Sequence, residues 1–190
     1  MPRKRSGPDI PTGSVRKDLA DKLAAELKGS REFGQPVIYE RLFRTGKARV
    51  TVIWDGWQNL PLQERTATIL RAYELAEGEE SRDRIALASG LTVPEAHAAG
   101  MLPAQIIPAR RKDDPLTEDQ IQQALLEEGG SLLFDPSRVH LYFSTPEEAE
   151  AARQRLIQRF PGSEEVWLIN VEITAQDFAK GQDWATVMEQ

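Results

Sequence analysis

The sequence predicts an α+β protein made of two tandem units, each with the order helix, strand, strand, helix, strand. Small mixed sheets with helices packed mainly on one face are the expected architecture. Three observations support this prediction. The pattern occurs in residues 14–102 and again in residues 117–174, and a linker rich in proline and charge spans residues 103–116. The composition, with 40% hydrophobic and 28% charged residues, is typical of globular chains.

Apolar residues at helical spacing open the first unit. Leucines and alanines recur every three or four residues between Ser14 and Gly29, and glycine commonly follows the last turn of a helix. Two β-rich runs, 37–43 and 49–54, flank a short loop that contains glycine. Such a pair of runs predicts a β-hairpin.

Proline and glycine mark the rest of the first unit. A helix is expected to begin near Pro61, because proline suits the first helical turn, and to end at Gly78. Residues 84–88 are expected to form a third strand, and a short helix follows over residues 92–100. The unit therefore ends at residue 102, before the linker.

The second unit repeats this order with clearer helix starts. Thr117 and Gln120 have the spacing of a capping box, in which each side chain bonds the backbone of the other residue. Thr145 is followed by a proline and two glutamates, which suit the first turn of a helix. Strands are expected over residues 132–134 and 138–143, between the two helices.

The last predicted strand, 166–174, alternates apolar and other residues, as a strand with one buried face does. Residues 175–190 are expected to form a C-terminal tail or a short helix, and Gly181 weakens the helical alternative. Whether the two units are true duplicates stays open, because few positions are identical between them.

The order of elements resembles that of K-homology domains of the second type and of the related BolA-like fold. A shared order implies a fold and does not imply a function. Nucleic-acid-binding K-homology domains clamp a nucleic-acid backbone with a glycine-x-x-glycine loop, and that loop is absent from the predicted units.

The net charge of −6 is distributed unevenly. Residues 1–17 contain five basic residues against Asp9, a balance of +4, so the remainder carries −10. Residues 1–13 are rich in proline and glycine, which is typical of a flexible arm. A basic arm attracts nucleic acid, whereas an acidic body repels it; the alternative is a solubilising tail. The basic residues at this end are Arg3, Lys4, Arg5, Arg16 and Lys17.

Composition excludes several classes of protein. The chain has no cysteine, which excludes a disulfide framework and thiolate chemistry. No apolar run approaches the roughly 20 residues that cross a bilayer, and the first six residues lack the apolar segment of a secretory signal. We therefore expect a soluble, cytoplasmic protein without membrane association.

His97 and His140 are the only histidines, and they lie in different predicted elements. His140 is expected to share a strand face with Tyr142, out of phase with Val139 and Leu141. Either histidine could act as a general base, since histidine titrates near neutrality; the alternative is a partly covered structural residue. A zinc site needs three or four ligands, and no phosphate-binding or dinucleotide fingerprint is present, so no cofactor is expected.

The string from Trp54 to Asn59 is the most distinctive in the chain. It follows a predicted strand, a common position for ligand sites, and exposed tryptophan often anchors interfaces. The candidate binding residues are Trp54, Asp55, Trp57 and Asn59. The alternative is that Trp54 belongs to the core, that Asp55 and Gly56 form a turn, and that Trp57 packs over the start of the following helix.

Three functional hypotheses follow. The first is a non-enzymatic interaction protein that binds a protein partner or itself, since no catalytic set converges and short sheets expose edges that an oligomer would cover. The second is a nucleic-acid-associated protein that uses the basic N-terminal arm. The third is an enzyme that uses His97 or His140.

Overall fold

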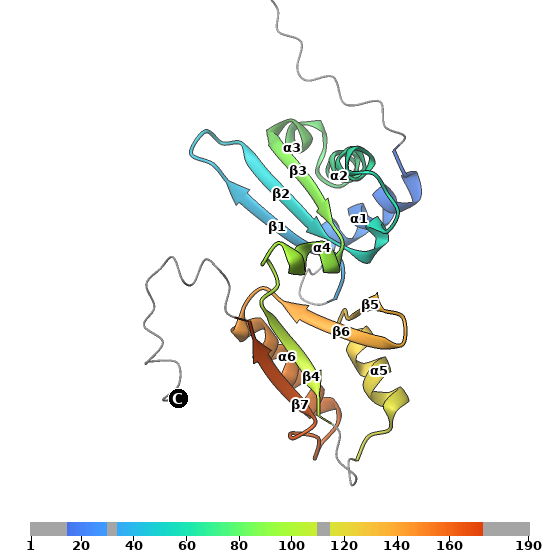
Figure 1. Cartoon of the computed structure of the whole chain (residues 1–190). Helices are drawn as coiled ribbons and strands as arrows, with labels where there is room; N and C mark the ends of the chain where they lie inside the picture. The colour runs from blue at the N-terminus through green and yellow to red at the C-terminus, as the bar shows by residue number, and fades with distance from the viewer. Residues whose placement is uncertain (1–14, 30–33, 110–114, 173–190) are drawn as a thin grey trace, which may run out of the picture. The chain divides into compact units, whose positions relative to one another are not determined.

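The computed structural model describes residues 15–29, 34–109 and 115–172. The chain divides into two compact units, residues 1–92 and 93–190. One unit contains a three-stranded sheet and the other a four-stranded sheet, each accompanied by helices (Figure 1). The predicted α+β class with two small sheets is therefore confirmed. The expected arm over residues 1–13 and the tail over 175–190 lie outside the described residues.

The first unit follows the predicted order with one addition. Strand β1 pairs antiparallel with β2, and β3 pairs parallel with β2, so the sheet is mixed. The short helix α3 was not predicted, and β3 is longer than the expected strand. The elements are α1 (Lys17–Lys28), β1 (Val37–Leu42), β2 (Ala48–Ile53), the 3-10 turn η1 (Asp55–Trp57), α2 (Leu62–Glu77), α3 (Glu79–Arg84) and β3 (Ile85–Leu91).

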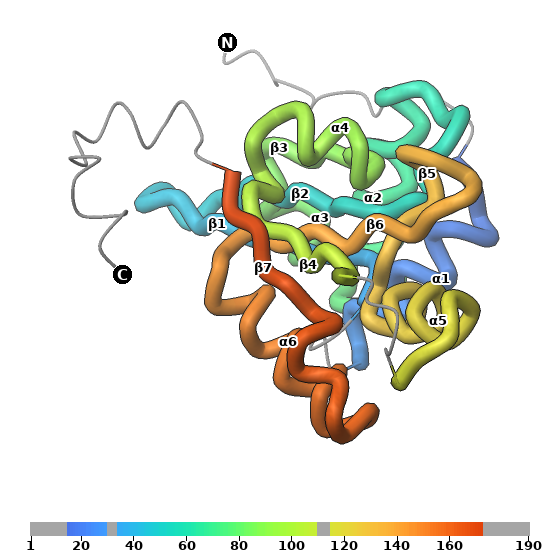
Figure 2. The backbone as a smooth tube through the Cα atoms, turned by 60° about the horizontal axis from the view of Figure 1, so that its bottom comes forward, coloured from blue at the N-terminus to red at the C-terminus, as the bar shows by residue number. Residues whose placement is uncertain are grey.

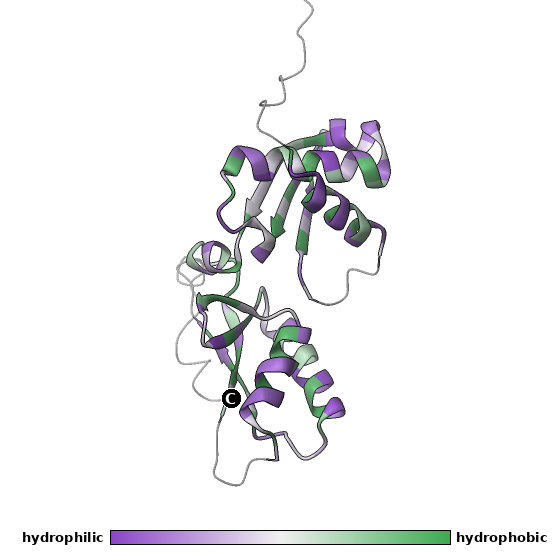
Figure 3. Cartoon of the chain, turned by 90° about the vertical axis from the view of Figure 1, so that its right-hand side faces the viewer, coloured by the Kyte–Doolittle hydropathy of each residue, from purple (hydrophilic) through white to green (hydrophobic). Residues whose placement is uncertain are grey.

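Helices α1 and α2 cover one face of this sheet. Leu23 of α1 and Ile69 of α2 pack in one core with Val50 and Val52 of β2, and all four are fully buried. Burying an aliphatic side chain of this size contributes about 1.5–3 kcal/mol. The helices alternate hydrophilic and hydrophobic residues, as amphipathic helices do (Figure 3). The residues that alternate with Val50 and Val52 along β2 therefore point to the opposite face of the sheet.

The second unit contains a four-stranded sheet in the order β5-β6-β4-β7, with every neighbouring pair antiparallel. Figures 1 and 2 show β6, β4 and β7 side by side. From β4 onward the chain runs strand, helix, strand, strand, helix, strand, which is the ferredoxin-like arrangement. The elements are α4 (Val93–Ala98), β4 (Ala104–Pro108), α5 (Glu118–Glu127), β5 (Ser131–Asp135), β6 (Arg138–Phe143), α6 (Pro146–Arg159) and β7 (Trp167–Val171).

The prediction of a linker over residues 103–116 was wrong at Ala104–Pro108, because these residues form the interior strand β4. Ala104 and Ile106 point into the core, and Pro108 ends the strand, where a missing N–H is tolerated. Residues 93–102, assigned to the first unit from sequence, fall in the second compact unit. The two units consequently differ in sheet topology, because β4 lies between β6 and β7 whereas β3 lies directly beside β2.

Helices α5 and α6 cover one face of the second sheet. Leu125 of α5 and Leu156 of α6 pack with Leu141 of β6 and Trp167 of β7 in one core. The predicted capping box is confirmed at α5, where Thr117 and Gln120 bond each other's backbone. The predicted cap of α6 is confirmed too, since Thr145 Oγ1 accepts a hydrogen bond from the Glu148 N–H at 3.2 Å. None of the described helices is long and apolar enough to cross a membrane.

Candidate functional site

The second sheet has an open face, on the side away from α5 and α6. Val139 and Leu141 of β6 are buried under the helices, so His140 and Tyr142 point the other way. The register extends this face across the sheet, because Gln105 of β4 pairs with Tyr142 and with Asn170 of β7. The next row contains Ile107 and Leu168. The predicted common face of His140 and Tyr142 is thus confirmed.

Four rings gather on this open face. His97 comes from α4, Phe134 from β5, and His140 and Tyr142 from β6; we call them the histidine–aromatic cluster. His97 stacks on Tyr142 with ring centroids 4.3 Å apart. Phe134 contacts the other three rings, with centroids 4.9 Å from Tyr142, 5.1 Å from His140 and 5.5 Å from His97. The fold therefore brings together the only two histidines of the chain.

Burial and neighbouring charges set the protonation of this cluster. Burial lowers the pKa of His140 most and Arg138 lowers it further, Asp135 opposes them, and His97 adds the smallest decrease. Burial also raises the pKa of Tyr142, with a contribution from Glu172. Both side chains are therefore uncharged at neutral pH. His97 Nε2 lies 3.8 Å from Glu172 Oε1, which makes a charged pair if the imidazole is protonated.

A shallow groove of about 220 Å³ runs beside the cluster, between β4 and β6. Its floor is apolar and includes Ile107 and Pro108, and its polar groups belong to Gln105, Arg138 and His140. A second hollow of about 430 Å³ shares Pro108 and Arg138 and extends toward α5. This arrangement presents planar rings and one guanidinium at the surface, which suits recognition of another surface.

The open face has no arrangement of metal ligands. Among the described residues, no group of three or more His, Cys, Asp or Glu side chains is placed to hold a metal ion. His97 and His140 reach each other only through the packed rings of Tyr142 and Phe134. A role of either histidine as a general base stays a prediction from the sequence.

The site predicted around Trp54 lies in the first unit, where Trp57 is buried, Trp54 and Asp55 are half-buried and Asn59 is exposed. Trp57 is 0% exposed, and its Nε1 donates a hydrogen bond to the Val52 carbonyl at 3.0 Å. Trp54 meets Trp57 edge to face at 5.1 Å. The Asp55 N–H donates to Gln35 Oε1 at 2.9 Å, and Asn59 has a positive φ of 62°. Trp57 therefore belongs to the core, deeper than the alternative interpretation placed it, and is not an exposed interface anchor, whereas Trp54 is only half-buried.

The basic residues predicted to bind nucleic acid fall into two groups. Arg3, Lys4 and Arg5 lie outside the described residues. Arg16 precedes α1 and Lys17 begins it, and the Arg16 guanidinium binds both carboxylate oxygens of Asp18, at 3.1 and 2.8 Å. Arg16 is thus already paired with a carboxylate.

No family model and no curated protein matches this sequence, and no solved structure matches its fold. Function therefore has to be argued from the arrangement of this chain's own side chains.

The histidine–aromatic cluster was missed from sequence except for the shared face of His140 and Tyr142. Period-two alternation along one strand places those two residues together. His97 and Phe134 join them only through the packing of α4 and β5 on the open face, and no local pattern encodes that packing.

Proposed function

We propose that the chain is a non-enzymatic interaction protein whose second unit binds a protein partner, or a second copy of the chain, through the open face of its sheet. The observation that supports this proposal is the gathering of aromatic and aliphatic side chains on the face of the sheet that α5 and α6 do not cover. Leu168 of β7 is 51% exposed there and lies opposite Ile107 of β4, the strand that separates β7 from β6. Interface cores are enriched in such residues and depleted of charge.

The electrostatics of the face favour binding over chemistry. His140 and Tyr142 are uncharged at neutral pH, because burial shifts both pKa values away from neutrality. Uncharged rings lose less solvation free energy than charged groups when a partner covers them. Arg138 lies at the edge of the same groove, where an arginine can supply a polar contact at the rim.

The test uses two leucines of the same unit. Leu168→Asp places a carboxylate on the open face, whereas Leu126→Asp places one on α5, where the leucine is 39% exposed. For both variants we would measure how much partner protein the tagged full chain recovers. Light scattering would measure self-association. We expect Leu168→Asp to weaken association at least about tenfold, which corresponds to about 1.4 kcal/mol, and Leu126→Asp to leave it unchanged. Equal association of parent and Leu168→Asp would contradict the proposal.

A further inference from the structure

The first unit also has an open sheet face, and it is basic. Arg49 and Thr51 of β2 alternate with Val50 and Val52, so they lie on the side away from α1 and α2, where Arg49 is exposed and Thr51 is buried. Cross-strand register places Arg41 of β1 directly opposite Arg49, and Leu87 of β3 on the other side of Arg49. The two guanidinium side chains thus start from neighbouring positions on one surface.

Two like charges directly opposite on a sheet destabilise it. Cβ atoms in such pairs are about 4.5–5.5 Å apart, and both arginines are exposed. Neither Arg41 nor Arg49 forms an ion pair with any residue in the described part of the chain. An anion bound between them would relieve the repulsion and could accept two N–H hydrogen bonds from each guanidinium group.

The carboxylates nearest along the chain are directed elsewhere. Glu40, the acidic residue of β1, lies on the helix-covered side, where it accepts a hydrogen bond from the Tyr73 hydroxyl. Asp83 accepts from Arg82 through its side chain at 2.7 Å, and its carbonyl accepts from Lys47 Nζ at 2.9 Å. The row next to the arginines contains Tyr39, Thr51 and Ser89, which are uncharged.

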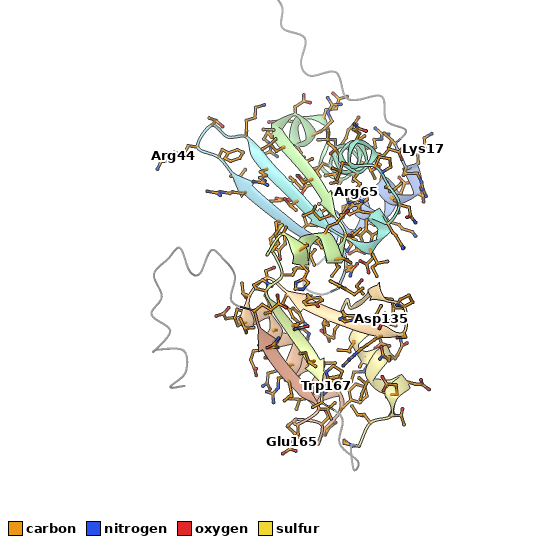
Figure 4. All side chains as sticks on the ribbon, in the orientation of Figure 1. Lys17, Arg44, Arg65, Asp135, Glu165 and Trp167 are labelled. Atoms are coloured by element: carbon orange, nitrogen blue, oxygen red, sulfur yellow. The ribbon has the colours of Figure 1, made fainter. Side chains whose placement is uncertain are left out.

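The hairpin that joins β1 and β2 carries further positive charge. Arg44 lies at the tip of the β1–β2 hairpin and points outward (Figure 4). Residues 14–92, which leave out the basic arm, contain 13 Lys and Arg against 12 Asp and Glu, a balance of +1, whereas residues 93–190 contain 8 against 17, a balance of −9. The acidity of the whole chain therefore comes from the second unit.

We propose that Arg41 and Arg49 form a phosphate-binding site on the first unit, and that its occupant is the backbone of a single-stranded nucleic acid. Paired guanidinium groups match phosphate oxygens, and the half-buried Tyr39 ring in the adjacent row offers a surface on which an unpaired base can stack. This site is separate from the open face of the second unit and from the basic N-terminal arm.

The experiment measures binding of fluorescently labelled 20-nucleotide poly(U) and poly(dT) to the full chain by anisotropy, over a series of salt concentrations. Arg41→Gln/Arg49→Gln removes the pair, and Lys22→Gln/Lys28→Gln removes the same charge from α1 of the same unit. We expect the arginine variant to bind at least about tenfold more weakly and to lower the salt slope by about 1.4, at about 0.7 for each phosphate contact on a single strand, and the lysine variant to retain most of the affinity.

The arginine variant has a built-in folding control. Because it removes a like-charge pair, its melting temperature should equal or exceed that of the parent. Three results would overturn the proposal: equal affinity of both variants, loss of all binding when residues 1–13 are deleted, or preference for phosphatidylserine vesicles over either oligonucleotide. Retained preference for single strands over a DNA duplex of equal length supports it.

Discussion

The imidazole of His97 stacks on the phenol ring of Tyr142, with centroids 4.3 Å apart and ring planes inclined by 24°. This contact joins the short helix α4 to the interior strand β6. A six-residue helix has little intrinsic stability, so its position depends on such contacts.

Replacing His97 with alanine should therefore loosen the second unit. Aromatic pairs contribute about 0.5–1.5 kcal/mol beyond their buried area, and we expect the free energy of unfolding to fall by about 1 kcal/mol. Urea denaturation of the full chain measures the loss. His97→Phe is the matched control, because it keeps a ring at this position and should retain most of the stability. Equal stability of the parent and His97→Ala would show that α4 is held by other contacts.

His140 should make the second unit less stable in mild acid. Its folded pKa is lowered by burial and by Arg138 and His97, with Asp135 opposing, from an ordinary value of 6.5. Between the folded and unfolded pKa values the unfolded chain binds more protons, so stability rises with pH. The contribution is complete above about pH 6.5 and is lost as the pH falls through that value toward the folded pKa.

The measurement is urea unfolding at pH 7.5 and 5.5 for the parent and for His140→Gln. We expect the parent to lose more stability than the variant between these pH values, because the variant lacks the titrating imidazole. Imidazole NMR signals followed across the same range report the pKa directly. A His140 pKa at or above its ordinary value would refute the prediction.

Gly130→Ala should destabilise the packing of α5 on β6. A Cβ at this position would lie 2.4 Å from Val139 Cγ1 and 2.7 Å from the Leu125 carbonyl oxygen, which is backbone and cannot rotate away. Overpacking of this kind costs about 1–3 kcal/mol. Gly29→Ala is the control, since the nearest atom to its Cβ is 3.6 Å away. Thermal unfolding should separate the two variants, and equal melting temperatures would exclude the proposed clash.

Thr145→Ala should weaken the start of α6. The Thr145 hydroxyl oxygen accepts from the Glu148 N–H, one of the donors that a helix start leaves without an intrahelical partner. Loss of such a cap costs about 1 kcal/mol. Thr45→Ala, in the exposed hairpin loop, removes the same atoms without removing a helix cap. If both variants unfold at the same urea concentration, the cap contributes nothing measurable.

The sequence predicted elements well where a local pattern was strong. Strand β6 matches its expected range, and the caps at Thr117 and Thr145 mark the starts of α5 and α6. Helix α3 was missed because it is short and polar, with only Ser81 buried. Strand β4 was missed because Pro103 and Pro108 flank it, although its alternation of buried and less buried residues is readable.

The candidate surfaces were less accessible to prediction. The opposition of Arg41 and Arg49 follows from a hairpin centred on Thr45, but the acidic total of the chain, which comes from the second unit, concealed the positive charge of this hairpin. The tryptophan string was predicted as a possible surface, yet burial of Trp57 depends on how α2 and β2 pack around it. Such packing depends on contacts between segments far apart in the chain, and a local sequence pattern does not show these contacts.

Strand β4 has a consequence for synthesis on the ribosome. It pairs on one side with β6 and on the other with β7, the last described strand. The pairing of Ala104 with Val171 therefore cannot form until β7 has been synthesised. Until Trp167–Val171 leaves the exit tunnel, the nascent second unit exposes one unpaired edge along β4. Exposed edges recruit other strands, and non-local pairing is slow. The interval between the translation of β6 and that of β7 is therefore when this unit is most exposed to aggregation.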